Sequence, residues 1–151
     1  MSLTPADFTL TTAPLSELDG LTWNAMARLR QDVFVVEQDC AYPDLDGRDE
    51  EATTLHLWAA APDGTVAATL RILHEDQGRA RRIGRVATAQ EWRGNGLMGH
   101  LLETAISRCG GLPIELEAQS HLQAWYERFG FERVGEEFLE DGILHVPMRK
   151  G

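Results

Sequence analysis

A glycine-rich turn between a predicted strand and a predicted helix carries the clearest chemistry in this sequence. The turn reads RGNG at residues 93–96, follows an apolar run at residues 83–88, and precedes apolar residues that recur at helical spacing from Leu97. Glycines let a ligand approach the backbone closely, and the first N–H groups of a helix attract an anion. The pattern therefore predicts a phosphate-binding loop over residues 93–99.

Two common phosphate-binding motifs do not fit this loop. No Gly-Lys-Ser/Thr follows the turn, and no Gly-x-Gly-x-x-Gly run is present, which excludes a Walker loop and a dinucleotide fingerprint. The run RGNGLM at residues 93–98 instead resembles the pyrophosphate loop of the GNAT superfamily of acyl-coenzyme-A-dependent N-acyltransferases, Arg/Gln-x-x-Gly-x-Gly/Ala. Met98 departs from that pattern, and Gly99 follows one place later.

Further segments extend this resemblance over nearly the whole chain. YERFGF at residues 126–131 is similar to the second signature of the family, in which a Tyr ahead of Phe/Leu-Gly-Phe closes the coenzyme site. Segments similar to the ElaA-type branch of the superfamily lie at residues 34–38, 42–47, 83–86 and 118–123. The resemblance implies that acetyl-CoA is the cosubstrate and that the acetyl group passes directly to an amine in a ternary complex.

The resemblance also implies which residues bind the coenzyme. Backbone groups of Val86, Ala87 and Thr88 should contact pantetheine and the thioester, where N–H groups would form an oxyanion hole. The pyrophosphate should lie on the loop, whose residues are Arg93, Gly94, Asn95, Gly96, Leu97, Met98 and Gly99.

Acyl transfer to an amine needs a proton for the departing thiolate and a group that takes a proton from the ammonium. Tyr126 is the candidate general acid, because a phenol with a pKa of about 10 keeps its proton at neutral pH. The alternative is that Tyr126 only packs against its aromatic neighbours. The side chains that qualify by type as the general base are Glu37, Glu117, His56 and His121, with Glu37 preferred. The alternative for Glu37 and Glu117 is that they attract the ammonium and leave its proton to water.

Charge is unevenly distributed in this acidic chain. The net charge of −10 argues against nucleic acid as a partner. Residues 79–93 hold five Arg against one acid, and residues 37–51 hold seven acids against one Arg. Unless each run is simply a solvated face, this predicts a basic patch beside the loop and an acidic rim that collects a small-molecule or peptide amine. The predicted substrate-binding residues are Glu37, Gln38, Asp44, Asp46, His56 and His121. We predict no metal site, because the run from Asp44 to Gly47 lacks the EF-hand spacing.

The elements that position these residues follow from the apolar periodicity. Strands are predicted at residues 7–12, 54–61, 66–74, 80–88 and 113–118, with a terminal hairpin of 131–139 and 143–149. Helices are predicted from an N-cap at Thr22 to about residue 35, over residues 95–109, and from an N-cap at Ser120 to residue 129. The strand after the second helix should pair in parallel with the strand before it, and Pro147 favours an edge strand.

This order of elements is that of the GNAT fold, an α+β (α/β/α) sandwich. The sheet should be mixed and mostly antiparallel, with one parallel strand pair splayed at the acyl-CoA site. We expect one domain over residues 1–151, in the cytoplasm and without a membrane partner, as a monomer or homodimer. No apolar run reaches the roughly 18 residues that a membrane span needs, and residues 1–13 lack the features of a signal peptide. A non-catalytic acyl-CoA sensor and an interaction domain with an empty loop are the alternatives.

Overall fold

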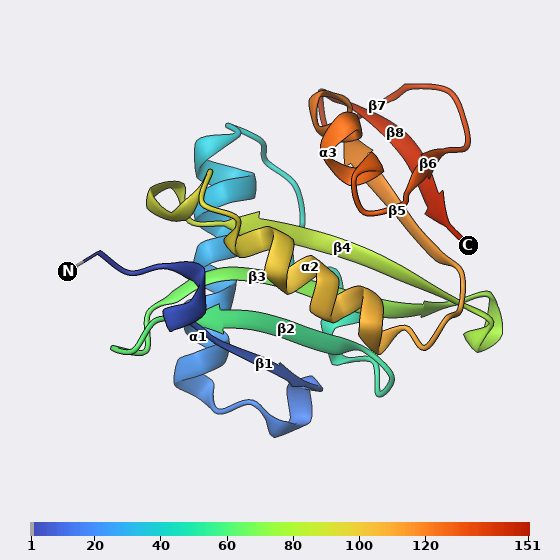
Figure 1. The fold of residues 1–151 in the computed structure, drawn as a ribbon. Coiled ribbons are helices and arrows are strands. Elements are labelled where there is room, and N and C mark those ends of the chain that lie inside the picture. Colours follow the sequence, from blue (N-terminus) through green and yellow to red (C-terminus); the bar gives the residue numbers. More distant parts are fainter. Residues whose placement is uncertain (1) are drawn as a thin grey trace.

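A mixed sheet forms the centre of the computed structural model, which describes residues 2–151 and leaves Met1 outside (Figure 1). The strands are β1 Thr9–Ala13, β2 Leu55–Ala60, β3 Val66–Glu75, β4 Ala80–Thr88, β5 Ile114–Gln119, β6 Glu132–Arg133, β7 Phe138–Glu140 and β8 Ile143–Lys150. They lie in the order β1-β2-β3-β4-β5-β8-β6, with β7 also paired to β8. Every described pairing is antiparallel except that of β4 with β5.

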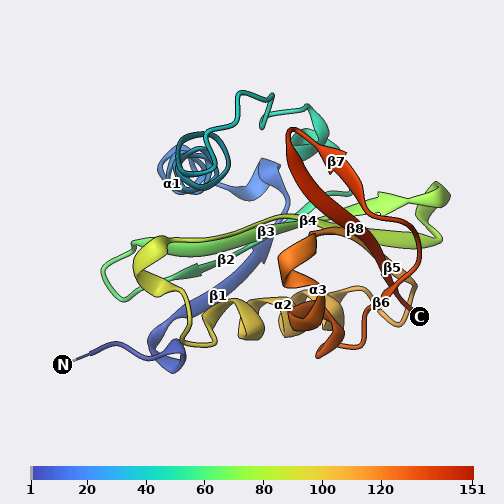
Figure 2. The same ribbon diagram turned by 90° about the horizontal axis from the view of Figure 1, so that it is seen from above.

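Helices cover both faces of this sheet. Helix α1 (Gly20–Arg30) continues into a π-helical segment at Gln31–Glu37 and lies on one face. Helices α2 (Leu97–Arg108) and α3 (Gln123–Glu127) lie on the other face (Figure 2). The predicted α/β/α sandwich is therefore confirmed. Within residues 2–151, no helix combines the length and the apolar character needed to cross a membrane.

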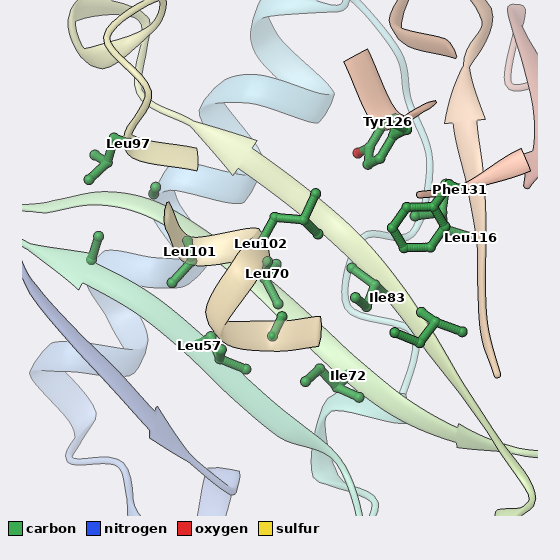
Figure 3. Packing of buried hydrophobic residues seen from close by; sticks show 14 of the residues in the cluster. Leu57, Leu70, Ile72, Ile83, Leu97, Leu101, Leu102, Leu116, Tyr126 and Phe131 are labelled. Atoms are coloured by element: carbon green, nitrogen blue, oxygen red, sulfur yellow. The ribbon is translucent and has the colours of Figure 1, made fainter. Parts of the chain in front are cut away.

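The hydrophobic core fixes α2, and with it the preceding loop, against the sheet. Leu101 and Leu102 of α2 are fully buried, and they belong to one cluster with Leu57, Leu70 and Ile72 from β2 and β3 (Figure 3). Burying a side chain of this size contributes roughly 1.5–3 kcal/mol. This packing against β2 and β3 therefore fixes the position of α2 on the sheet, and with it the loop that precedes the helix.

The parallel pair is short, as its predicted splay requires. Strands β4 and β5 pair only at Arg81 with Ile114 and at Arg82 with Glu115. Beyond these residues the two strands diverge (Figure 1). The end of β4 therefore presents an unpaired edge toward β5 over residues 83–88.

Strand β4 also carries a β-bulge that the sequence did not reveal. Between the pairs Thr69–Ala87 and Arg71–Gly84, two residues of β4 lie opposite one residue of β3. Arg85 is one of these two, and its φ of 50° lies in the left-handed region. A bulge bends a strand and re-aims its side chains. It occurs here at the point where β4 separates from β5.

The predicted N-caps at Thr22 and Ser120 are wrong. The carboxylate of Asp19 accepts the backbone N–H of Thr22 at 2.7 Å, so α1 begins at Gly20. Ser120 opens a 3-10 turn before α3, and its Oγ is buried without a hydrogen-bond partner among residues 2–151.

The terminal hairpin is interrupted, and the edge position predicted for Pro147 is wrong. Pro147 lies on β8 between β5 on one side and β6 and β7 on the other. The carbonyl of Pro147 accepts the N–H of Val134 at 2.9 Å. The N–H and C=O of one strand residue face the same side, so the N–H that proline lacks would have faced the residues that follow β6. Within the described chain, no strand pairs with Pro147 on that side. A Cβ on Gly135 would lie 2.7 Å from Pro147 Cγ. The chain between β6 and β7 therefore has no room for a side chain at residue 135, where it passes Pro147.

Candidate functional site

One cavity of about 1090 Å³ brings most of the predicted site residues together. It is lined from the end of the π-helical segment, from β4 and the glycine-rich loop, and from β5, α3 and the β7–β8 hairpin. The predicted residues in its wall are Glu37, Gln38, Asp46, Val86, Thr88, Arg93, Gly94, Gly96, Leu97, Met98, Gly99, Glu117, His121 and Tyr126. Outside the wall lie Asp44, His56, Ala87 and Asn95.

The loop before α2 presents free backbone donors to this cavity. Gly96 is the N-cap of α2 with a φ of 86°, and an added Cβ there would meet no atom within 4 Å. Asn95 Oδ1 accepts the Leu97 N–H at 3.1 Å, which orders the first turn. Among residues 2–151 the N–H groups of Met98 and Gly99 have no acceptor. Free amides at the positive end of a helix suit a diphosphate, and the departure at Met98 leaves its amide in place.

A bidentate ion pair links this loop to the opposite wall. The Arg93 Nη1 and Nη2 atoms lie 2.6 and 2.7 Å from the Glu37 carboxylate oxygens, while Arg93 Nε donates to the Thr88 carbonyl at 3.0 Å. The hydrogen bonds from Arg93 hold the pKa of Glu37 below its usual value. A carboxylate held in this way is a weak base, so the geometry does not favour Glu37 in the role preferred for it.

The acidic segment of residues 44–49 is neutralised within the fold. Asp44 pairs with Arg30 at 2.9 Å, and Asp46 pairs with Arg71 at 2.7 Å. Asp49 receives both of these arginines, at 2.8 and 3.1 Å. These ion pairs hold the segment against α1 and β3, so Asp44 and Asp46 do not present the free charge expected of an acidic rim.

His56 lies in the core, away from the cavity. It is 1% exposed, its Nε2–H donates to the Asp49 carbonyl at 3.1 Å, and its ring packs against Trp23 at 5.3 Å. Burial lowers its pKa. These contacts give His56 a structural position, whereas His121 is exposed and lines the cavity.

Tyr126 combines burial with access to the cavity. It is 5% exposed and makes edge contacts with Trp125 and Phe131, at ring distances of 4.9 and 6.1 Å. Its hydroxyl is the polar end of a side chain that otherwise belongs to the core (Figure 3). Burial raises the pKa of Tyr126, which keeps the phenol protonated at neutral pH. Both the acid role and the packing role are compatible with this position.

Sequence reasoning missed the residues that the β7–β8 hairpin adds to the wall. Glu140, Asp141 and His145 line the cavity on the side of Glu117. Burial and then the charge of Glu117 raise the pKa of Glu140. The only sequence signal for these residues was the alternation of apolar and polar residues along 143–149. That alternation places His145 in the cavity wall only if the register of β8 against β5 is known.

Comparisons with known proteins agree with this arrangement. A family model described as an acetyltransferase (GNAT) domain matches residues 31–151. A UPF0039 protein of Mycobacterium bovis is 47% identical over 134 residues, which cover 87% of this chain and 86% of that protein. The crystal structure of an acyl-CoA N-acyltransferase from Pseudomonas aeruginosa is 38% identical with a TM-score of 0.88, covering 95% of this chain and 99% of that one. Escherichia coli ElaA is 34% identical with a TM-score of 0.89 over the same shares of the two chains. The chain therefore belongs to the GNAT acetyltransferase family and is an ElaA-like member of it.

Proposed function

We propose that this protein transfers an acetyl group from acetyl-CoA to a primary amine of a cationic acceptor, directly within a ternary complex. Acyl-CoA-dependent acyl transfer in general follows from membership of the family; the acetyl donor and the cationic acceptor belong to the proposal. The observation that carries it is that one continuous cavity joins the amides at the start of α2 to the carboxylates of the β7–β8 hairpin. A cytoplasmic monomer or homodimer, acting without nucleic acid or membrane, is part of the same proposal.

The coenzyme side of the cavity is the side of the loop. The free Met98 and Gly99 amides would bind the diphosphate, aided by the guanidinium groups of Arg93 and Arg128, which also line the cavity. The unpaired edge of β4 at residues 83–88 would hydrogen-bond to the pantetheine chain. Backbone N–H groups on that edge would polarise the thioester carbonyl.

The acceptor side is acidic at one wall. Glu117, Glu140 and Asp141 line it together, and Glu117 is only loosely paired, with Arg82 at 3.9 Å. Carboxylates in a partly enclosed site attract an ammonium group more strongly than they would in open water. A polyamine, an amino sugar, a peptide N-terminus and a lysine side chain all carry the required charge.

The chemistry needs one bond to form and one to break. The neutral amine nitrogen attacks the thioester carbonyl carbon, the C–N bond forms, and the C–S bond breaks. Tyr126 donates its proton to the departing thiolate, and its raised pKa suits a group that must enter the reaction protonated. The nitrogen releases one proton as the amide forms, and this proton restores the phenol through water.

A direct test is to offer acetyl-CoA and a broad panel of primary amines to the purified protein. We expect free thiol to appear faster than without protein, and mass spectrometry to detect an acetylated amine. Tight coenzyme binding without thiol release above the background rate, for every amine, would favour the non-catalytic sensor instead.

A further inference from the structure

The cavity wall contains a histidine whose position is set by strand register. His145 on β8 lies opposite Gln119 of β5 and Phe138 of β7. Because neighbouring residues of a strand face opposite sides, the next residue, Val146, points into the core and is fully buried. His145 therefore faces the cavity, where it is half-buried.

One hydrogen bond fixes which ring nitrogen carries the proton. His145 Nδ1 lies 2.8 Å from the carbonyl oxygen of Ile143. A carbonyl oxygen can only accept, so Nδ1 must carry hydrogen. In the neutral ring the lone pair is then on Nε2, which no residue of the described chain hydrogen-bonds.

An aromatic contact holds the ring in this orientation. The rings of His145 and Phe138 stack with centroids 5.8 Å apart and planes inclined by 23°. Together with the Ile143 bond, this stacking restricts rotation about the side-chain bonds of His145. A base whose ring is oriented before the substrate arrives transfers protons more efficiently.

The charged groups around His145 are mostly carboxylates. Glu117 faces it from β5, Glu140 from β7 and Asp141 from the hairpin turn, while Arg82 approaches Glu117 from β4 at 3.9 Å. Carboxylates outnumber the single cation in this group. They would attract the ammonium group of an acceptor toward this part of the cavity.

We propose that His145 Nε2 is the general base that takes a proton from the acceptor ammonium; this inference rests on the proposed acyl transfer. Of the three ammonium protons, one passes to Nε2 and one stays on the product amide. The third leaves the nitrogen after the C–N bond forms and, through water, restores the proton that Tyr126 gives to the thiolate. His145 then releases its proton to water. Two of the four bases expected from the sequence are less suited, because Glu37 is paired with Arg93 and His56 lies in the core.

The test compares His145→Asn with the wild-type protein, using an amine that the wild-type protein acetylates. Asparagine keeps an N–H donor for the Ile143 carbonyl but has no equivalent of Nε2. We expect kcat/KM for the amine to fall on the order of 100-fold near neutral pH. In the variant only the amine that is already neutral can react, so we expect its activity to keep rising with pH toward the pKa of the amine, with the calorimetric affinity for acetyl-CoA unchanged.

A second acceptor separates proton removal from a structural effect. A fluorinated analogue of the same amine is less basic and is already neutral at the assay pH, so His145→Asn should slow its acetylation far less. Arg108→Gln, on the exposed end of α2 away from the cavity, is the control and should behave as the wild-type protein with both amines. If His145→Asn does not fold, His145→Gln provides the same comparison.

Three outcomes would overturn the inference. In the first two, the wild-type protein is active, but the variant keeps the pH profile of the wild-type protein or loses equal activity with both amines. These remove only His145 as the base and leave the proposed function standing. In the third, the wild-type protein acetylates no amine, which removes the proposed function together with this inference.

Discussion

Glu37 and Arg93 join the end of the π-helical segment to the phosphate loop through two charge-assisted hydrogen bonds of 2.6 and 2.7 Å. The Glu37 side chain is 40% exposed and the Arg93 side chain 37% exposed, so the pair itself should contribute at most about 1 kcal/mol to stability. Its importance is positional, because Arg93 stands beside the free amides at the start of α2. A diphosphate bound there would compete with Glu37 for the same guanidinium group.

Removing the charge of Glu37 should therefore strengthen coenzyme binding. For Glu37→Gln we predict a dissociation constant for acetyl-CoA about two- to fivefold lower, which corresponds to about 0.4–1 kcal/mol. Calorimetric titration at low and high salt measures the change, and the gain should shrink as salt rises. Glu17→Gln changes the net charge equally on an exposed segment far along the chain from the loop, and should bind as the wild-type protein does. Weaker binding by Glu37→Gln would mean that Glu37 positions Arg93 instead of competing for it.

Loss of the Tyr126 hydroxyl should slow turnover without changing coenzyme binding. For Tyr126→Phe we predict a fall in kcat on the order of 100-fold, since the thiolate would lose its proton donor. The phenyl ring keeps the packing against Trp125 and Phe131. Steady-state thiol release and calorimetric affinity separate the two effects. Tyr42→Phe removes the other phenol in the cavity, which donates to Asp44, and serves as the matched comparison. Equal kcat values for wild type and Tyr126→Phe would assign Tyr126 to packing alone.

The arginine-paired carboxylates should make stability fall in acid. The hydrogen bonds from Arg71 hold the pKa of Asp46 well below its usual value. A lowered folded-state pKa stabilises the fold above the unfolded value of about 3.9, and this contribution is lost as the pH falls through the folded pKa. At pH 7, Asp46→Asn should lower the free energy of unfolding by about 1.5–3 kcal/mol, measured by urea denaturation. The difference from wild type should narrow below about pH 4. A constant difference from pH 7 to pH 2 would show that the ion pair is not its source.

Local patterns in the sequence predicted the loop, its helix and the parallel strand pair. RGNG at residues 93–96 is flanked by a strand and a helix whose periodicity is visible within about twenty residues, so the prediction needed no distant contacts. The order of elements then limited the topology to few choices. The candidate loop could therefore be predicted from this one segment, together with the strand and helix that flank it.

Features that join distant segments were not accessible in the same way. Arg93 and Glu37 are 56 residues apart, and nothing local indicates that they pair. Asp44 and Asp46 looked like a free acidic rim because their partners, Arg30, Arg71 and Arg85, come from three other elements. Charge runs read along a chain do not reveal which charges the fold neutralises.

The remaining differences between the predicted and the observed structure concern how the strands pair and in which register. The bulge at Arg85 inserts one residue into β4, and the first strand of the predicted last hairpin is divided into β6 and β7, which both pair with β8. His145 reached the cavity wall only because β8 pairs with β5 in one particular register. A shift of one residue would have turned it into the core, and sequence patterns rarely fix register to that degree.

Binding of the diphosphate by the loop of residues 93–99 is tested most directly by titrating acetyl-CoA into two glycine variants in a calorimeter. Gly96→Asp and Gly64→Asp each place a carboxylate at a left-handed glycine, with φ of 86° and 90°, where a Cβ meets no atom within 4 Å. Gly64 lies in the β2–β3 turn, whereas Gly96 lines the cavity. We predict wild-type affinity for Gly64→Asp and at least about 100-fold weaker binding for Gly96→Asp, a loss of about 2.7 kcal/mol. Wild-type affinity in Gly96→Asp, or no heat with the wild-type protein itself, would contradict the assignment of this loop to the coenzyme.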